Sequence, residues 1–306
     1  MPRPGLYLTV LGGAALSSWL LGFLVSTLAE RVGAVDVPNL GRKRHARALP
    51  LLGGVAIWAS VVTVTVGLWT GGFLPDRWVT ARMVIAAGIG SLALMLVGFM
   101  DDRFRLPPLV QMVGPVAAVS AVLVGGVRIT AVTNPWGGVI ALPLALTPLL
   151  TVGWLLGTMY TTKLLDGLDG LVASITAIGG VIIFGVSLAW DAPSAATGVL
   201  ALALAGSCLG FLPHNLSPAR IFLGEGGSVF AGFALGLLAI ISGSKIATAL
   251  LVMGVPVADA AWVIVERLRH GDGVTRGDRR HLHYRLLERG WSSRQVVALL
   301  SALSAG

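Results

Sequence analysis

Cysteine and charge are both scarce in this chain of 306 residues, and each shortage excludes a class of protein. The one cysteine, Cys208, lies in an apolar run, so the chain has neither a disulfide framework nor a thiolate metal cluster. Only 12% of the residues are charged, whereas 55% are hydrophobic and the mean hydropathy is +0.85. A soluble domain carries about twice that share of charge. The composition is therefore that of an integral membrane protein.

Apolar runs of about 20 residues, the length that crosses a bilayer as a helix, recur along the whole sequence. They predict an all-α integral membrane protein in which residues 1–306 form a single polytopic domain. The first run is long enough to span the bilayer, so we expect no cleavable signal. The last run is short. The expected helices cover residues 6–29, 53–72, 81–99, 108–127, 141–160, 171–190, 194–213, 226–243, 245–265 and 291–306.

One segment between the expected helices, residues 128–143, has a different pattern. Two runs rich in β-branched residues flank a group of turn-forming residues that includes Asn134, Pro135 and Gly137. This arrangement is typical of two short strands joined by a turn. We therefore expect a small hairpin there.

The basic residues indicate how the chain is oriented. With ten helices, 17 of the 22 Lys and Arg residues fall in one set of alternating loops. The side of a membrane protein that is richer in Lys and Arg is cytoplasmic. Both termini and the hairpin are therefore expected outside, on the periplasmic face. The net charge of +8 then reports topology, and we expect no nucleic-acid partner.

Most acidic residues fall on the same side as the basic ones. Carboxylates between apolar spans are costly unless they lie at a membrane face or bind something, so this clustering predicts a cytoplasmic site. A transporter is the alternative from another class, but its polar groups would gather near the bilayer midplane. Only Asp259 is expected at such a depth. The acids on the basic side are Asp101, Asp102, Asp166, Asp169, Glu225, Glu266, Asp272, Asp278 and Glu288.

Two acidic pairs are candidates for chemistry. Asp101 and Asp102 are adjacent and repel each other, which implies a nearby cation, either a neighbouring Arg or a divalent metal. The alternative is a solvated helix end neutralised by arginine. Asp166 and Asp169 stand three residues apart with a glycine after each, so both can face one ligand. The alternative there is ordinary Asp-Gly turn chemistry.

Phosphate-binding features occur at three further places. Glu225 lies in a glycine-rich turn that opens a helix, where backbone N–H groups bind phosphate and a carboxylate can hold a hard cation. His281, His283 and Arg285 form a basic loop suited to a diphosphate, or alternatively to anionic lipid. Residues 42–47 are polybasic and suit lipid headgroups or a lipid phosphate. The acids favour magnesium over zinc.

Taken in order, these stretches resemble the polyprenyl-phosphate N-acetylhexosamine-1-phosphate transferases of glycosyltransferase family 4. The resemblance implies transfer of a sugar 1-phosphate from a UDP-N-acetylhexosamine to polyprenyl phosphate with release of UMP, as a first step in cell-wall or surface-glycan synthesis. It also implies a multi-pass location in the cell membrane, Mg²⁺ or Mn²⁺ as cofactor, and a homodimer. The matching stretches are residues 43–54, 98–108, 166–170, 211–224, 256–259 and 278–287.

The final loop is more similar to the N-acetylglucosamine-1-phosphate branch than to the phospho-N-acetylmuramoyl-pentapeptide transferases, which remain the alternative. UDP-N-acetylglucosamine is therefore the expected donor, and undecaprenyl or decaprenyl phosphate the expected acceptor. The resemblance implies that Asp101 or Asp102 activates the lipid phosphate and that Asp166 and Asp169 orient the substrates. Glu225 would hold magnesium, with Asp101 as a further ligand. The implied substrate-binding residues are Lys43, His45, Lys163, Asn215, His281, His283 and Arg285.

The chain departs from the family pattern in four respects. Glu225 replaces an aspartate and reaches one methylene further, and Lys163 could contact phosphate as a cation. The changes fit equally well with a divergent, non-catalytic relative that binds lipid phosphate. The departures are Tyr160 and Lys163 in place of two Asn, Glu225 in place of Asp, Gln111 and Pro115 in place of Lys and Gln, and Tyr284 in place of His.

Overall fold

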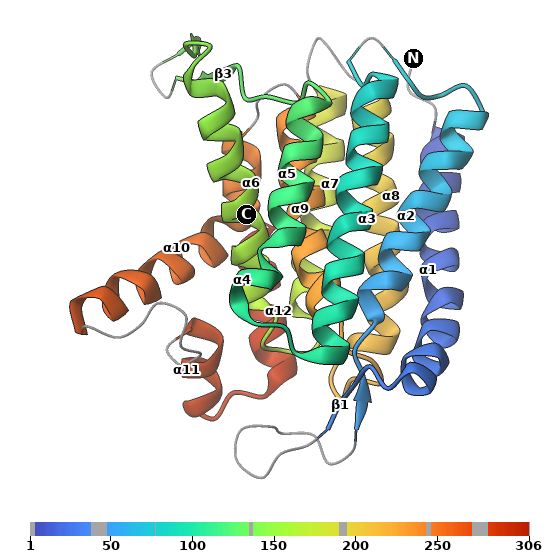
Figure 1. Cartoon of the computed structure of the whole chain (residues 1–306), viewed down its shortest axis with the longest axis vertical. Helices are drawn as coiled ribbons and strands as arrows, with labels where there is room; N and C mark the ends of the chain where they lie inside the picture. Colours follow the sequence, from blue (N-terminus) through green and yellow to red (C-terminus); the bar gives the residue numbers. More distant parts are fainter. Residues whose placement is uncertain are drawn as a thin grey trace.

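The computed structural model describes residues 4–37, 48–76, 78–134, 137–189, 195–242, 246–270 and 281–305. These residues are almost all helical. Most of the long helices form one bundle, and one of them, α10 (Ile246–His270), extends away from it (Figure 1). Lys43 and His45, expected to bind substrate, lie outside the described residues.

Each of the ten expected apolar runs overlaps a helix. The long helices are α1 (Pro4–Val32), α2 (Gly53–Thr70), α3 (Ala81–Phe104), α5 (Val113–Val124), α6 (Leu146–Leu165), α7 (Leu171–Ala189), α8 (Ala195–Asn215), α9 (Gly224–Ile241), α10 (Ile246–His270) and α12 (Ser293–Ser304). The short helices are α4 (Pro108–Gln111) and α11 (Leu282–Glu288). Among the described residues, six helices are long and apolar enough to cross a membrane, namely α1, α2, α3, α7, α8 and α9. The protein is thus an all-α integral membrane protein.

Several expected helix boundaries differ from the structure, and the causes of two are local. The run 108–127 is interrupted at Met112, between α4 and α5, because Pro115 has no N–H to donate to the carbonyl of Gln111. The run 141–160 becomes helical only at Leu146, since residues 139–141 form a strand. The last helix begins at Ser293, where Ser292 and Gln295 form a capping box.

The expected hairpin is confirmed. Strands β3 (Ala131–Thr133) and β4 (Val139–Ala141) pair antiparallel, with Val132 opposite Ile140. Gly137 and Gly138 have φ of 112° and 81°, which side chains rarely allow, so the turn needs glycine. A second small sheet joins β1 (Val35–Asp36) to β2 (Leu49–Pro50).

Helix α9 is the buried centre of the bundle, with nearly all its residues inaccessible to solvent. Helices α2 and α3 approach it so closely that only glycine fits. A Cβ built on Gly54 would lie 2.0 Å from the Cα of Gly227, and one on Gly98 would lie 2.2 Å from that of Gly226. Small residues allow such backbone contact between membrane helices. Because these contacts occur near the start of α9 and the end of α3, they bring those two termini together.

Candidate active site

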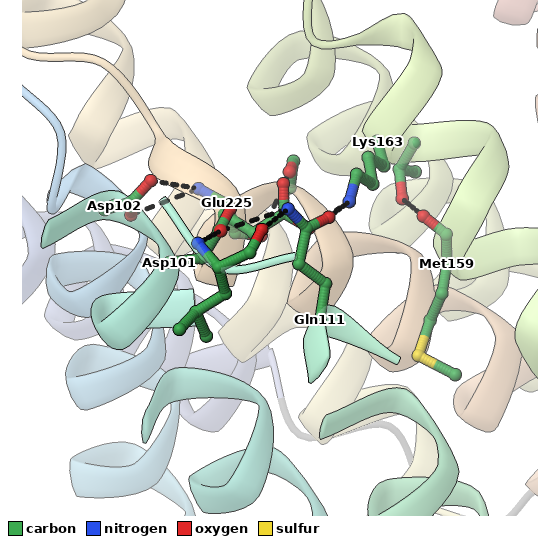
Figure 2. A network of polar contacts seen from close by, with 9 residues as sticks. Asp101, Asp102, Gln111, Met159, Lys163 and Glu225 are labelled. Carbon is green, nitrogen blue, oxygen red and sulfur yellow. Dashed lines mark hydrogen bonds and ion pairs between the residues drawn. The ribbon is translucent and has the colours of Figure 1, made fainter. Parts of the chain in front are cut away.

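The end of α3, the start of α9 and the end of α6 meet at one end of the bundle, together with α4 (Figure 2). Asp101 and Asp102 come from α3, Glu225 from α9 and Lys163 from α6. Gln111, at the end of α4, lies among them. The fold therefore assembles three of the predicted acids and one predicted substrate-binding residue.

The two adjacent aspartates have separate partners. One oxygen of Asp101, Oδ1, accepts hydrogen bonds from the backbone N–H of Leu106 (2.7 Å) and from Nε2 of Gln111 (3.0 Å). The carboxylate of Asp102 accepts from the backbone N–H of Glu225, at 3.1 and 3.2 Å. Asp102 thus binds the first turn of α9, where a negative charge is favoured by the free N–H groups. Both half-buried carboxylates are therefore fixed in position by backbone donors.

The first residue of α9, Gly224, must be a glycine. Gly224 has φ of 77°, and a Cβ there would lie 2.6 Å from Oδ2 of Asp102 and still closer to the carbonyl of Leu51. A side chain would displace the Asp102 carboxylate from the helix start. Close packing around the acids is thus enough to explain the glycine at this position.

Lys163 is the cation among these acids. Its Nζ lies 2.5 Å from Oε1 of Glu225 and 2.9 Å from Oε1 of Gln111. The side chains of Lys163 and Glu225 are 26% and 20% exposed, so the pair is mostly screened from water. The ring of Tyr160 has its centroid 5.8 Å from the same Nζ. Gln111 thus connects Asp101 to Lys163, a link that sequence reasoning missed.

The loop between α6 and α7 carries the second acidic pair. Asp169 accepts from the backbone N–H of Ala219 at 3.1 Å. Asn215, the last residue of α8, is buried between this loop and the loop that joins α8 to α9. Its side-chain amide accepts from the N–H of Gly170 and donates to the carbonyl of Ile221, both at 3.0 Å. Its amide therefore connects the loops, a role that differs from the substrate contact that the resemblance implies.

Asp166 is the more exposed of the two carboxylates in this loop. Many protein atoms surround it although one side of the residue is open to water. This desolvation, together with repulsion from the Glu225 and Asp169 carboxylates, raises the pKa of Asp166 from 3.8 to about 7. A carboxyl group with such a pKa exchanges protons near neutral pH.

The histidine loop packs against the same loop. His281 Nδ1 lies 2.9 Å from Oδ2 of Asp259, and Oδ1 of Asp259 accepts from the backbone N–H of Leu282 at 2.7 Å. Asp259 thus anchors the start of α11. The sequence had singled out Asp259 only as the one acid expected deep within a membrane span. Arg285 is exposed on α11, so the structure places it on the surface of this helix.

His283 is fully buried, and neither ring nitrogen has a hydrogen-bond partner among the described residues. It lies against Gly167, where a Cβ would be 2.6 Å from its Nε2. Burial, reinforced by the neighbouring His281, lowers the pKa of His283 from 6.5 to about 4. Its ring is therefore neutral at pH 7 and borders a small cavity that Asp259 also lines.

The arrangement fits the expected magnesium ion poorly. Magnesium takes several oxygen ligands in near-octahedral geometry. The oxygen of Glu225 is paired with an ammonium group, and Asp101 and Asp102 accept N–H donors. Within the described part of the chain, no group of three or more His, Cys, Asp or Glu side chains is arranged to hold a metal. The donor set around Glu225 suits the ammonium of Lys163 better.

Comparison with known proteins identifies relatives over most of the chain. The profile of glycosyl transferase family 4 matches residues 84–243. A decaprenyl-phosphate N-acetylglucosaminephosphotransferase of Mycobacterium leprae is 34% identical over 94% of this chain and 78% of its own length. A probable undecaprenyl-phosphate N-acetylglucosaminyl 1-phosphate transferase of Bacillus subtilis is 29% identical over 90% and 76%. A phospho-N-acetylmuramoyl-pentapeptide-transferase of Desulforudis audaxviator is 32% identical over 95% and 92%.

Proposed function

Because the chain belongs to glycosyl transferase family 4, we propose that it transfers N-acetylglucosamine 1-phosphate from UDP-N-acetylglucosamine to a polyprenyl phosphate. The observation that carries this proposal is the convergence of Asp101, Asp102 and Glu225 at one end of a membrane helix bundle. Relatives named as decaprenyl- and undecaprenyl-phosphate enzymes support a long-chain polyprenyl acceptor.

The reaction is a phosphoryl transfer. An oxygen of the lipid phosphate attacks the phosphorus that bears the sugar, forming a new P–O bond. The bond from that phosphorus to the bridging oxygen breaks, and UMP leaves with the electron pair. The product is a polyprenyl diphosphate N-acetylglucosamine. Such transfers depend mainly on positioning and on neutralising charge.

Asp166 is the residue best matched to activate the lipid phosphate. Its pKa of about 7 lies close to the second pKa of a phosphate monoester, about 6, so a proton can pass between them. Asp169 is held by Ala219 and orients the loop, while Asp101 and Asp102 fix the ends of α3 and α9. His281 and Arg285 lie on the neighbouring segment, where a diphosphate could be held.

The site lies on the cytoplasmic face in this proposal. The supporting pattern is the excess of Lys and Arg in the loops on that side, together with ten helices that would place both termini outside. The multi-pass chain would then use a nucleotide sugar from the cytoplasm and a lipid from the bilayer. Magnesium and a homodimer stay predictions of the resemblance.

The test is UMP release by the purified protein. With UDP-N-acetylglucosamine and decaprenyl phosphate, we expect UMP in amounts equal to the new lipid-linked sugar.

Asp166→Asn should lower the rate about a hundred-fold, the loss typical of removing a general base. Its matched control is Asp76→Asn, which is expected to leave the rate unchanged because Asp76 lies in a different loop, just before Val79 and α3. Release with UDP-N-acetylmuramoyl-pentapeptide alone would instead favour the pentapeptide-transferase function. No release from folded protein with either donor would overturn the proposal.

A further inference from the structure

Asp101, Asp102 and Glu225 form an acidic site, and the ammonium of Lys163 lies where a cation would neutralise their charge. Its Nζ is 2.5 Å from Oε1 of Glu225 and 2.9 Å from Oε1 of Gln111. An ammonium has three N–H donors, and the described residues supply acceptors for two of them. The third is available to an anionic oxygen, because about a quarter of the side chain remains exposed.

The charges around Glu225 require such a cation. The carboxylates of Asp101 and Asp166 lie close enough to interact electrostatically with that of Glu225, and Asp102 interacts with all three. Like charges at this spacing are strongly unfavourable without a positive partner. Lys163 supplies one positive charge from the protein itself, on a side chain that also donates to Oε1 of Gln111 (Figure 2).

A divalent ion at Glu225 would compete directly with this ammonium. It would have to bind an oxygen already paired with Lys163, or sit beside a positive charge in a partly buried site, where repulsion is weakly screened. The hydrogen bond from Gln111 likewise engages the carboxylate of Asp101. These contacts join three of the residues at which the chain departs from the pattern that it resembles, Gln111, Lys163 and Glu225.

We propose that Lys163 is the resident cation of this site, taking the place of a divalent metal at Glu225 and donating its third N–H to the diphosphate of the nucleotide sugar. This role presupposes the proposed transfer reaction. Lys163 then neutralises charge on a diphosphate oxygen while the P–O bond to UMP breaks. Glu225 and Gln111 are positioning residues that aim the ammonium.

The experiment measures metal dependence in two independent ways. Turnover is followed as UMP release from UDP-N-acetylglucosamine and decaprenyl phosphate, in EDTA and in Mg²⁺. Binding is followed by the electron paramagnetic resonance signal of free Mn²⁺, which does not require activity. For the wild-type protein we expect equal turnover in EDTA and in Mg²⁺, and no bound Mn²⁺. Turnover that EDTA abolishes and Mg²⁺ restores would overturn the proposal, as would tight Mn²⁺ binding by the wild type.

Variants separate a resident cation from a merely structural lysine. Lys163→Asn should lose about a hundred-fold in metal-free turnover, the loss typical of removing one charge-stabilising donor. Lys163→Asn/Glu225→Asp should gain Mn²⁺ binding, with turnover that Mg²⁺ stimulates. Arg82→Asn, a loss of one exposed basic residue at the far end of α3, is the matched control and should match the wild type. Lys163→Asn turnover equal to wild type in EDTA would contradict the role.

Two outcomes remain to be separated. If Lys163→Asn fails to fold, Lys163→Arg retains the charge and should keep metal-independent turnover, and a requirement for Mg²⁺ in that variant would overturn the proposal. If no variant turns over any substrate, the proposed transfer function fails. Mn²⁺ binding then still tests whether Lys163 takes the place of a divalent metal at Glu225. Binding by the double variant and none by the wild type would support Lys163, whereas no binding by either would count against it.

Discussion

At the scale of single residues, Glu225 joins two parts of the site. Its backbone N–H holds Asp102, and its carboxylate holds Lys163. Glu225→Gln keeps the size of the side chain and the backbone contact but removes the charge. The ammonium of Lys163 therefore loses its counter-ion and the contact that orients it. We expect kcat to fall about a hundred-fold with KM less affected, as for other losses of charge positioning. Steady-state UMP release measures both constants.

The control for this change is Glu288→Gln, which removes an exposed carboxylate from α11. Its kcat should equal that of the wild type, because no described contact joins Glu288 to the acidic site. Unchanged kcat in Glu225→Gln, with thermal stability also unchanged, would show that the Lys163 ion pair is dispensable for the reaction.

His283 should make stability depend on pH. Its pKa is about 4 in the folded protein and 6.5 when exposed, so the unfolded chain takes up the proton first as the pH falls. The contribution of neutral His283 is therefore complete above pH 6.5 and is lost progressively towards pH 4, by roughly 3 kcal/mol. Asp166, with its pKa raised to about 7, has the opposite effect between pH 7 and 4.

A matched variant separates the two effects. His283→Leu retains Asp166 but lacks the histidine. The Tm of the wild type should therefore fall relative to that of the variant as the pH falls from 6.5 to 4. Thermal unfolding in detergent at a fixed heating rate measures it. A difference in Tm that stays constant over this range would mean that His283 finds a partner or solvent when protonated.

At the scale of helices, the glycine contacts of α9 set the geometry of the site. A Cβ on Gly98 would meet the backbone of Gly226 at 2.2 Å, so Gly98→Ala must push α3 away from α9. We expect a loss of about 1–3 kcal/mol in stability, the usual cost of overpacking. Turnover should also fall, because Asp102 on α3 would move away from the N–H of Glu225.

The same helix offers a control. A Cβ on Gly88 has no neighbour within 4 Å, so Gly88→Ala should leave stability unchanged or raise it slightly through helix propensity. Thermal unfolding and UMP release of both variants, under one set of conditions, make the comparison. Equal stability of the two alanine variants would mean that α3 and α9 are further apart than the structure has them.

Hydrophobic runs predict these helices well, because length and apolarity are local properties. Every expected run overlaps a helix, and the hairpin at residues 128–143 follows from its own turn residues. The boundaries that fail do so where a local feature overrides composition, as Pro115 does between α4 and α5 and as strand β4 does before α6. Which helices touch depends on small residues spread over the chain, so the central place of α9 could not be predicted.

At the scale of the whole molecule, the sequence predicts which acids gather but not what they contact. Alternating loops place Asp101, Asp166 and Glu225 on one side by counting alone. The pairing of Lys163 with Glu225 arises only when α6 and α9 pack together. Gln111 joins them because the end of α4 lies close to the end of α3, where its amide donates to Asp101. Asn215 and Asp259 connect segments for the same reason, through contacts between residues distant in the sequence.

Cysteine labelling can test the predicted orientation of the whole chain in the membrane. Native Cys208 is fully buried and should not react with maleimides, so new cysteines can be labelled without a background. Val139→Cys lies on β4 of the hairpin, where the side chain is 71% exposed, and Glu288→Cys lies on α11 beside the histidine loop. The excess of Lys and Arg on the side of α11 predicts that it is cytoplasmic. An impermeant maleimide added to spheroplasts should therefore label Val139→Cys alone, and both variants after lysis. Labelling of Glu288→Cys in intact spheroplasts would place the acidic site outside, where it could not meet a cytoplasmic nucleotide sugar.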